Sequence, residues 1–398
     1  MNPSLHEPIL VLNAGSSSLK FSVYETGSNG TLIAGAHGQV ERIDTRPHLS
    51  VTGASGAHLA ECSVEQRGHA GAIAAIHHWF ADHVGNEAGF SAVGHRVVHG
   101  GATYVEPTLI DAQVLAAIEA LTPLAPLHQP HHVAAIRAVQ AFAPHLPQIA
   151  CFDTAFHHRQ PAIASEYALP RRLTEQGVRR YGFHGLSYEY IMSYLPEVAP
   201  QSAQGRVVVA HLGNGASMCA IDNGVSIAST MGFTAVDGLP MGTRTGTLDP
   251  GVILYLLRHE GMTVDQVEHL IYEESGLLGM SGVSADMRTL LMQDTPQTRH
   301  AIDLFVYRIG RELGSLVAAL GGIDALVLTG GIGEHAPAVR AQICRSAHWL
   351  GVSLDRYANL NGNALISDNE SKVPVWVIPT DENLMIARHT RRLLDMWR

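Results

Sequence analysis

The feature that most constrains this chain is a local pattern that occurs twice, once in each half. Residues 11–23 read VLNAGSSSLKFSV, and residues 209–221 read VAHLGNGASMCAI. Each segment is typical of two strands joined by a turn of glycine and small polar residues. In both halves, hairpin-linked strands come first and helical periodicity follows. We therefore predict an α/β fold built from a duplicated unit with mixed sheets.

The first half is expected to hold the first sheet and its helices. Asp111 is expected to be the N-cap of one helix. The expected strands are 8–15, 19–25, 30–43, 48–53 and 91–98, and the expected helices are 67–84, 111–121 and 130–142.

A second cycle of strands and helices begins near residue 150. We predict no helix or strand in the polar stretch between residues 154 and 206. The expected strands are 148–154, 206–215, 216–222, 224–230, 324–331 and 373–379. The expected helices are 249–260, 263–273, 284–293, 296–320, 336–347 and 383–397.

A chain of 398 residues exceeds one ordinary core, so two domains are expected. We place an N-terminal domain at 1–153 plus the closing helix 384–398, and a nucleotide-binding domain at 154–383. A ligand cleft is expected between the halves, since such sites commonly form there.

The net charge of −10 argues against nucleic acid or an anionic membrane as the main partner. The four cysteines are scattered without a CxxC pair, which disfavours a zinc site or a disulfide framework. The N-terminus lacks a basic region and a long apolar run, so a signal peptide is not expected. These features favour a cytoplasmic protein.

The first glycine-rich turn, NAGSSSLK at 13–20, has the groups that bind phosphate: Gly15 for close approach, serine hydroxyls, the Asn13 amide and the Lys20 charge. A plain polar hairpin turn is an equally good interpretation of this segment alone. The second turn, HLGNGAS at 211–217, has the same construction. Two such turns in equivalent places favour a polyphosphate site. No GxxxxGK[ST] occurs, which disfavours a P-loop enzyme.

A third glycine-rich segment, LTGGIGEHAP at 328–337, follows an apolar strand and begins a helix. Its glycines would let the backbone lie against a nucleoside or phosphate. The alternative is a tight strand-to-helix turn without a ligand.

Arg96 and Arg244 each lie in an apolar segment flanked by glycine, in GHRVVHGG and MGTRTG. Arginine in such surroundings needs a partner. The alternatives are a buried pair with a carboxylate, or an anchor for a substrate carboxylate or a transferring phosphoryl group. The presence of two such arginines favours the second.

Asp153 and Glu382 follow apolar strands, where carboxylates suit Mg²⁺. Asp381 is expected to be a helix N-cap instead. His184, in RRYGFHG, would be a buried core histidine by default. Its neighbours favour a role in stabilising transition-state charge.

Together these segments resemble the acetate kinase family of acetate and propionate kinases, nearly end to end and in order. The matching segments are NAGSSSLK, GHRVVHGG, PLH, FDTAFH, RRYGFHG, HLGNGAS, TMGF, MGTR, SGVSADMR, GGIGEH and TDENLMIAR. The resemblance implies a duplicated actin/sugar-kinase/Hsp70-like (ribonuclease H-like) fold and a homodimer. It also implies ATP as co-substrate with Mg²⁺ (Mn²⁺ as a substitute) and reversible phosphoryl transfer to acetate, which gives acetyl phosphate and ADP.

The resemblance also implies roles for individual residues. The catalytic group would be Asn13, Arg96, Asp153, His184 and Arg244. Substrate would contact Arg96, Val98, Leu127 and Phe183, and Mg²⁺ would be held by Asn13 and Glu382, with Asp153 helping to position it. His128 and His211 match active-site histidines of the family. Nucleotide would contact Ser16, Ser18, Lys20, His211, Leu212, Gly213, Asn214, Gly215, Asp286, Met287, Arg288, Gly331, Ile332, Gly333 and Glu334.

Four positions depart from the usual family pattern: Ala235, Thr247, His335 and Gln129. Ala235, where proline is common, would line the acyl pocket and could admit propionate, so acetate and propionate kinase both stay open. None of the departures is expected to touch the arginines, so the chemistry should be unaffected.

We expect direct in-line transfer, because the acetate oxygen is already an anion and needs no general base. The barrier is the approach of like charges, which cationic groups offset. A nucleotide-gated, chaperone-like ATPase of the same fold would need a peptide-binding appendage. A sugar kinase would need a neutral polar pocket with a catalytic aspartate.

Overall fold

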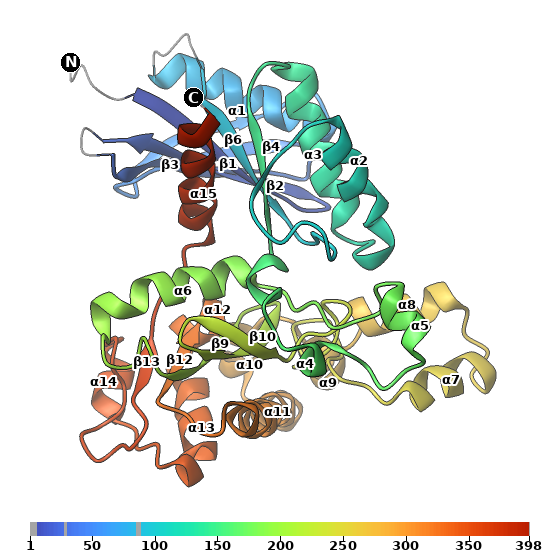
Figure 1. Cartoon of the computed structure of the whole chain (residues 1–398), viewed down its shortest axis with the longest axis vertical. Coiled ribbons are helices and arrows are strands. Elements are labelled where there is room, and N and C mark those ends of the chain that lie inside the picture. The colour runs from blue at the N-terminus through green and yellow to red at the C-terminus, as the bar shows by residue number, and fades with distance from the viewer. Residues whose placement is uncertain (1–5, 28–29, 85–88, 398) are drawn as a thin grey trace. The chain divides into compact units, whose positions relative to one another are not determined.

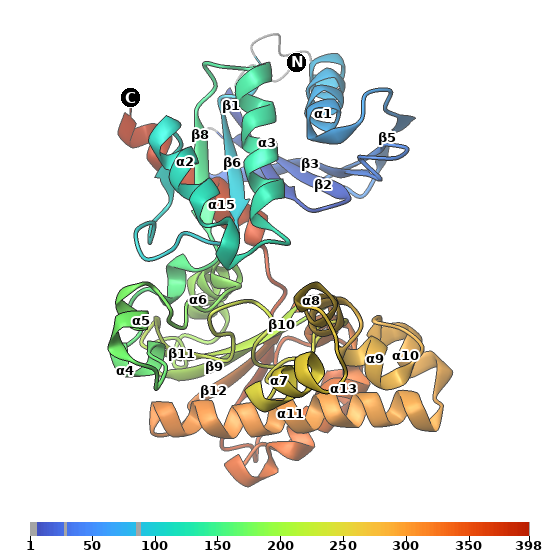
Figure 2. The ribbon, with the colours of Figure 1, turned by 90° about the vertical axis from the view of Figure 1, so that its right-hand side faces the viewer.

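The computed structural model describes residues 6–27, 30–84 and 89–397 (Figures 1 and 2). It divides into two compact units, unit 1 (residues 1–155 and 381–398) and unit 2 (residues 156–380). Within the described residues, no helix combines the length and apolar character needed to cross a membrane.

Unit 1 is built on a mixed sheet of eight strands in the order β5-β4-β3-β2-β1-β6-β8-β7. Strands β1, β6 and β8 run parallel, and the other neighbours pair antiparallel. The strands are β1 His6–Ala14, β2 Ser18–Thr26, β3 Leu32–Glu41, β4 His48–Gly53, β5 His58–Ser63, β6 Ala92–Val97, β7 Thr108–Leu109 and β8 Gln148–Phe152.

Helices cover both faces of this sheet. One face packs against α1 and α3, and the other against α15, the red helix of Figure 1. The core between α1, α3 and the sheet includes Leu12, Phe21, Ile76 and Phe80. The helices are α1 Gly68–Val84, α2 Ala112–Ala120, η1 Thr122–Leu124, α3 Gln129–Phe142 and α15 Glu382–Trp397.

Two predicted helix starts in unit 1 are confirmed. The Asp111 side chain accepts a hydrogen bond from the Val114 amide and caps α2. The Asp381 carboxylate accepts from the Leu384 amide at 2.8 Å and caps α15. Asp381 is therefore a helix N-cap, as the sequence predicted.

Unit 2 contains a five-stranded sheet in the order β11-β10-β9-β12-β13. Strands β9, β12 and β13 are parallel, and β10 and β11 are antiparallel additions. The bounds are β9 Arg206–Leu212, β10 Ala216–Asp222, β11 Val225–Ser229, β12 Ala325–Thr329 and β13 Val375–Val377.

One face of this sheet packs against α6, through a core that contains Tyr188, Ile191, Val207 and Val209. The long helix α11 contacts β9, β10 and β11 (Figure 2). The helices of unit 2 are α4 Ala162–Ser165, α5 Arg171–Glu175, α6 Gly185–Val198, α7 Pro250–Arg258, α8 Val264–Glu273, α9 Gly276–Ser281, α10 Met287–Gln293, α11 Pro296–Leu320, α12 Gly330–His335, α13 Pro337–Ser346, η3 His348–Leu350 and α14 Arg356–Leu360; η2, Ala155–His157, spans the boundary between the units.

The two sheets share one topology, which confirms the predicted duplication. The order β3-β2-β1-β6-β8 has the same sequence of antiparallel and parallel pairings as β11-β10-β9-β12-β13. Unit 1 adds β4 and β5 at one edge and β7 at the other. Each unit therefore places a glycine-rich turn at the carboxyl end of its first parallel strand.

Candidate active site

In unit 1, three predicted site residues lie at the carboxyl ends of neighbouring parallel strands. Leu12 of β1 lies opposite His95 of β6, so Asn13 and Arg96 each come one residue further along. Arg96 lies opposite Cys151 of β8, and the Asp153 amide donates to the Val97 carbonyl at 3.0 Å. The carboxyl ends of strands in open α/β sheets are where ligands bind.

The guanidinium of Arg96 is held by a carboxylate on each side. Its Nε donates to both oxygens of Asp153 at 3.0 and 3.1 Å, and its Nη2 donates to Asp153 Oδ2 at 2.7 Å. Its Nη1 lies 3.8 Å from Glu382 Oε2. Burial disfavours the Arg96 charge, but the Asp153 and Glu382 carboxylates outweigh it and raise the pKa of Arg96 above its ordinary value. Arg96 is a permanent, oriented cation.

Of the two alternatives for Arg96, a buried pair with a carboxylate and an anchor for substrate, the structure shows the pair with a carboxylate. The Asp153 side chain is 2% exposed, while those of Arg96 and Glu382 are 20% and 17% exposed. Asp153 is therefore suited to orienting the arginine from the buried side. Glu382, the first residue of α15, is the more accessible of the two carboxylates.

Within the described part of the chain, no group of three or more His, Cys, Asp or Glu side chains could hold a metal ion. Magnesium needs fewer protein ligands, because it keeps several waters and is bound through one or two carboxylates plus substrate phosphates. The oxygens of Asn13, Asp153 and Glu382 are of the kind that this ion prefers. The donor chemistry of this edge of the sheet therefore fits Mg²⁺.

The first glycine-rich turn joins β1 to β2, with Asn13 opposite Lys20 in the strand register. The Gly15 amide donates to the Ser18 carbonyl at 2.8 Å and closes the turn. Ser16 and Lys20 are exposed and Ser18 is half-buried, so their hydroxyl and ammonium groups are accessible to a ligand.

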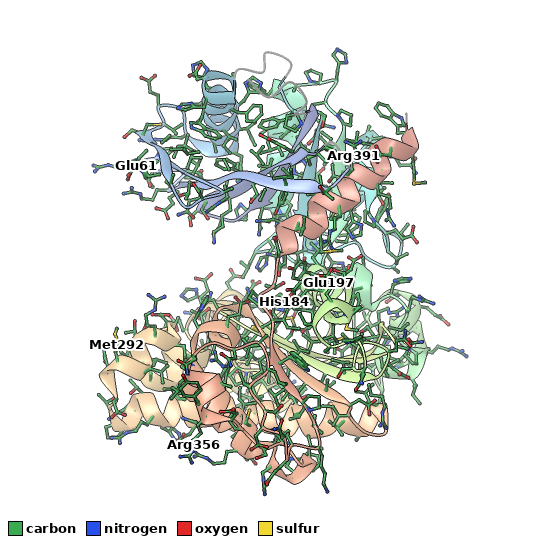
Figure 3. The ribbon with its side chains drawn as sticks, turned by 90° about the vertical axis from the view of Figure 1, so that its left-hand side faces the viewer. Glu61, His184, Glu197, Met292, Arg356 and Arg391 are labelled. Carbon is green, nitrogen blue, oxygen red and sulfur yellow. The ribbon has the colours of Figure 1, made fainter. Side chains whose placement is uncertain are left out.

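In unit 2, His184 precedes α6 in the left-handed conformation, with φ 58° (Figure 3). Its Nδ1 forms a hydrogen bond of 2.8 Å with the hydroxyl of Ser217, which also bonds the Tyr188 hydroxyl. The ring stacks on His211 at a centroid distance of 4.3 Å. A non-glycine residue in this backbone region is strained, which is common at functional sites.

His211 is fixed by a chain of hydroxyl groups. Its Nδ1 lies 2.8 Å from the Ser187 hydroxyl, which lies 2.9 Å from the Thr380 hydroxyl. Both imidazoles of the stack thus have Nδ1 engaged with a serine, which fixes their ring planes. The sequence predicted roles for the two histidines but none for these serines as their partners. Ser187 lies in a helix that the sequence pattern did not predict, and Ser217 was expected in the second glycine-rich turn and the strand that follows it.

Arg244 lies beside the second glycine-rich turn. A Cβ at Gly215 would be 3.2 Å from His184 Nε2 and 4.0 Å from Arg244 Nη1. The same Nη1 donates to the Ala235 carbonyl at 3.1 Å. The expectation that no departure touches an arginine is therefore wrong for Ala235, because its backbone contacts Arg244 directly.

The turn at residues 213–215 is closed by a hydrogen bond of 3.0 Å from the Gly213 amide to the Gly215 carbonyl. A Cβ at Gly213 would lie 3.8 Å from the Gly331 amide nitrogen and 3.9 Å from His211 Nε2. The Gly242 amide donates to the Asn214 carbonyl at 2.9 Å, and Leu212 is fully buried.

The turn from β12 into α12 requires glycine at its start. Gly330 has φ +76°, and a Cβ there would lie 2.8 Å from the Leu212 carbonyl oxygen. The Glu334 carboxylate accepts from the Gly330 amide at 2.8 Å and from the Thr380 amide at 3.2 Å. Glu334 therefore holds this turn against the end of β13 from within unit 2.

The predicted nucleotide segment at 286–288 begins α10. The Asp286 carboxylate accepts from the amides of Arg288 and Thr289 and from the Thr289 hydroxyl. That hydroxyl is the main reason that the pKa of Asp286 is lowered. Met287 is buried, so its side chain serves the core.

The residues predicted for the acyl pocket differ in exposure. Val98 and Phe183 are buried, at 6% and 2% exposed, whereas Leu127 is 37% exposed. Val98 is anchored by its amide, which donates to His132 Nδ1 at 3.1 Å.

The other three positions that depart from the family pattern differ in burial and contacts. Gln129 is fully buried and donates to the carbonyls of His99 and Ile118. The Thr247 hydroxyl donates to Asp237 at 2.9 Å. The His335 side chain is 78% exposed, so its ring is accessible at the end of α12.

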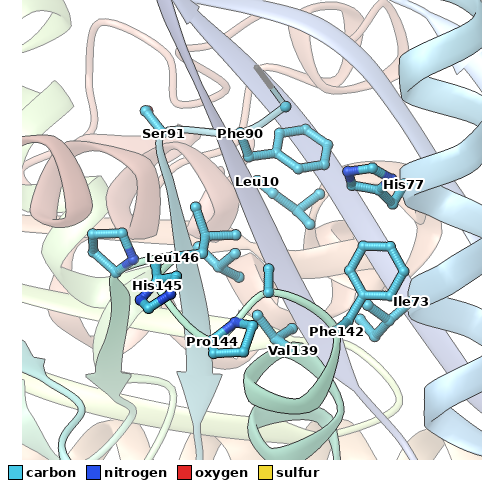
Figure 4. A pocket seen from close by; sticks show the side chains of 14 residues that line it. Leu10, Ile73, His77, Phe90, Ser91, Val139, Phe142, Pro144, His145 and Leu146 are labelled. Carbon is cyan, nitrogen blue, oxygen red and sulfur yellow. The ribbon is translucent and has the colours of Figure 1, made fainter. Parts of the chain in front are cut away.

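An apolar cavity of about 430 Å³ lies in unit 1, among residues that precede β6 and β8 and residues of α1 and α3 (Figure 4). Its lining includes Phe90, Phe142, Ile73 and Val139, together with His77. No arginine, lysine or carboxylate is among the described residues that line it. It lacks the charged groups that phosphoryl transfer requires.

Comparison with known proteins gives a consistent result. The model of the acetokinase family matches residues 8–388. The chain is 57% identical to an acetate kinase of Rhodopseudomonas palustris (strain ATCC BAA-98 / CGA009), over 98% of this chain and 99% of the relative. It is similar to the crystal structure of Porphyromonas gingivalis acetate kinase (36% identity, TM-score 0.88), over 98% and 100% of the two chains. It is also similar to a propionate kinase from Francisella tularensis (35% identity, TM-score 0.91), over 97% and 100% of the chains.

Proposed function

The chain belongs to the acetokinase family, and we propose that it transfers the γ-phosphoryl group of ATP reversibly to acetate, giving acetyl phosphate and ADP. It is a phosphotransferase with a carboxyl group as acceptor, and its fold is the duplicated actin/sugar-kinase/Hsp70-like fold. ATP is the co-substrate. The observation that carries the proposal is the fixed guanidinium of Arg96 at the end of β6, held by Asp153.

A cation that is positioned before substrate arrives needs no reorganisation during the reaction. We propose that Arg96 and Arg244 both act on the transferring phosphoryl group, and that Arg96 also holds the acetate carboxylate. His184 would donate to the charge that develops in the transition state. Because acetate is already ionised, the protein needs to position and neutralise charge rather than remove a proton.

Nucleotide would lie against the glycine-rich turns at 213–215 and 331–334, with His211 and the segment 286–288 beside it. The backbone amides of such turns suit phosphate oxygens. Ser16, Ser18 and Lys20 of the first turn would contact the phosphates. Val98, Leu127 and Phe183 would form the small apolar pocket for the acyl chain.

Asn13 and Glu382 would hold Mg²⁺, with Asp153 close to the same edge of the sheet. Bound Mg²⁺ would neutralise phosphate charge during transfer. Arg96 would then have a second effect, because its guanidinium pairs with both Asp153 and Glu382 beside the proposed ion. Homodimer formation and a cytoplasmic location are part of the same proposal.

A propionate kinase is the second candidate. The alanine at position 235, where the family commonly has proline, and the similarity to a propionate kinase structure favour it. One methylene in an apolar pocket changes specificity by only about 10–200-fold. Comparing kcat/KM for acetate, propionate and butyrate would rank the substrates.

The direct test is acyl phosphate formation, trapped with hydroxylamine, across a panel of carboxylic acids and nucleotides. We expect hydroxamate from acetate and ATP that depends on Mg²⁺. Binding of ATP in equal molar ratio without any hydroxamate would contradict the proposal and favour a nucleotide-gated binding protein.

A further inference from the structure

Unit 2 contains a pocket of about 590 Å³ between α13, η3 and α14, away from the residues proposed for transfer. Alanine, valine and leucine side chains form its apolar part. Arg345, His348 and Arg356 supply basic groups, and no carboxylate is among the described residues that line it. The whole chain carries a net charge of −10, so the basic lining runs against the global charge.

The two arginines come from different helices. Arg345 lies in the last turn of α13, and Arg356 is the first residue of α14; both are exposed (Figure 3 labels Arg356). Among the described residues, neither guanidinium has a hydrogen bond or ion pair with another side chain. A cation in the last turn is favoured by the helix dipole, which accounts for Arg345 but not for Arg356.

The carboxylates that neighbour the lining already have partners. Asp355 caps α14 by accepting from the amides of Tyr357 and Ala358 at 2.9 and 3.0 Å. Asp368 accepts from the Ser353 hydroxyl. The pocket therefore combines apolar lining residues with two guanidinium groups that have no side-chain partner among the described residues.

One wall of the pocket is joined to the proposed nucleotide turn. Asn359, which lines the pocket, accepts from Arg340 at its side-chain oxygen and at its carbonyl, both at 2.7 Å. Arg340 also donates to the carbonyls of Gly333 and Glu334 at 3.1 and 2.7 Å. A single buried guanidinium, 2% exposed, thus connects α14 to the end of α12.

We propose that this pocket binds a small amphipathic anion, a phosphate or carboxylate on an apolar body, and that its occupancy is transmitted to residues 330–334 through Asn359 and Arg340. Guanidinium groups recognise both head groups by paired hydrogen bonds. The volume suits a molecule of metabolite size. The effect on residues 330–334 rests on the proposed function, in which this turn contacts nucleotide. Binding of the anion to the pocket does not depend on that function.

Binding can be measured with 1-anilinonaphthalene-8-sulfonate, an aromatic sulfonate, by fluorescence titration of the full chain with ADP and acetate at saturation. We expect saturable binding that weakens at least about tenfold in Arg345→Gln/Arg356→Gln, because each charge-assisted contact is strong. Displacement of the probe by phenyl phosphate and by benzoate would distinguish a phosphate from a carboxylate head group.

The matched control is Arg258→Gln/Arg171→Gln. Arg258 lies in the last turn of α7 and Arg171 is the first residue of α5, so the pair repeats the helix positions outside the pocket. We expect the control to bind the probe as the unchanged chain does. Equal binding by all three proteins, or no saturable binding by the unchanged chain, would overturn the site.

Transmission is tested by the KM values of the hydroxylamine assay with phenyl phosphate present. Coupling between sites typically changes affinity by about 5–150-fold. We expect the KM for ATP to change at least about fivefold while the KM for acetate stays constant, and the change to vanish in Arg345→Gln/Arg356→Gln. A change that persists in this variant reflects competition at the transfer site and overturns the transmission. A loss of hydroxamate formation in the unchanged chain would count against the proposed function and leave the fluorescence result interpretable.

Discussion

The two units have the same five-strand topology but opposite chemistry at the ends of their parallel strands. In unit 1, an ionic group lies near the carboxyl ends of β6 and β8, with Arg96 between Asp153 and Glu382. In unit 2, the groups near the carboxyl ends of β9, β12 and β13 are glycine amides, imidazoles and hydroxyls, such as those of His211, Gly331 and Thr380. Shared topology therefore fixes where a site forms, and the side chains determine what it does.

The difference also shows two ways of fixing a functional group. Unit 1 orients its arginine with a buried carboxylate, which is strong but costs desolvation of two charges. Unit 2 orients its histidines with neutral hydroxyls, Ser217 for His184 and Ser187 for His211. Substitutions in unit 1 should therefore affect stability and turnover together, and those in unit 2 chiefly kinetics.

The largest expected effect concerns the arginines. Arg96→Gln and Arg244→Gln should each lower kcat by about 10²–10³, because a charge that stabilises the transition state is lost. Arg96→Gln should also lower the free energy of unfolding by about 3 kcal/mol, since Asp153 is left buried without its partner. Steady-state kinetics and denaturant unfolding measure the two losses.

The double variant Arg96→Gln/Asp153→Asn separates these effects. Neutralising both partners should restore most of the stability while kcat stays low. Normal turnover in both single arginine variants would remove the arginines from the mechanism.

The next effect compares the two glycine-rich turns. In Gly215→Ala the added Cβ would lie 3.2 Å from His184 Nε2, so the imidazole must shift. In Gly15→Ala the nearest atom is the Ser18 carbonyl oxygen at 3.4 Å, an ordinary contact. We expect kcat/KM for ATP to fall about tenfold in the first variant and less than about twofold in the second. Equal losses would mean that both turns approach their ligands equally closely.

A smaller effect is expected from the hydroxyls that orient the imidazoles. Ser217→Ala should lower kcat about three- to tenfold, because it removes the hydrogen bond that orients His184, and such a bond contributes about 0.5–1.5 kcal/mol. Ser187→Ala should instead raise the KM for ATP, since His211 is proposed to contact nucleotide. Ser217→Thr, which keeps the hydroxyl, is the control for Ser217→Ala. A loss of stability without any kinetic change would make these serines purely structural.

The smallest effect compares a helix cap in each unit. Asp381→Ala in unit 1 and Asp286→Ala in unit 2 should each cost about 1 kcal/mol of unfolding free energy. Only Asp286→Ala should raise the KM for ATP, because residues 286–288 are proposed to contact nucleotide. An unchanged KM would remove this segment from the nucleotide site.

The cap of unit 2 also predicts a pH dependence. The hydrogen bond from Thr289 lowers the pKa of Asp286 from its ordinary value of 3.8. A lowered carboxyl pKa gives stability above the unfolded pKa that is lost as the pH falls through the folded one. Acid unfolding of Asp286→Ala should lack this component, as a parallel titration with the unchanged chain would show.

Much of the fold was predictable because it depends on local periodicity. The strands around both glycine-rich turns and the long helix α11 lie where the residue pattern placed them. The helix α6 was not predicted from the sequence. It begins at a left-handed His184 without a side-chain cap and contains Pro196, so the usual start signals are missing. Strand β5 is exposed along most of its length and lacks the alternation that marks a strand.

The candidate site was predictable in its residue types and not in its internal contacts. Arg96, Asp153 and Glu382 were each named, but their direct pairing depends on the parallel register of β6 and β8 and on the start of α15. Likewise, the contact between Arg244 and the Ala235 carbonyl joins positions that the sequence treated as independent.

The sequence by itself determined the duplication, the glycine-rich turns and the chemical groups available for phosphoryl transfer, because periodicity and residue type are local properties. Only the tertiary structure decided which groups share a hydrogen bond, since those partners lie far apart in the chain. The pairs Arg96–Asp153 and Arg340–Asn359 meet through strand register and helix packing, which no single segment specifies.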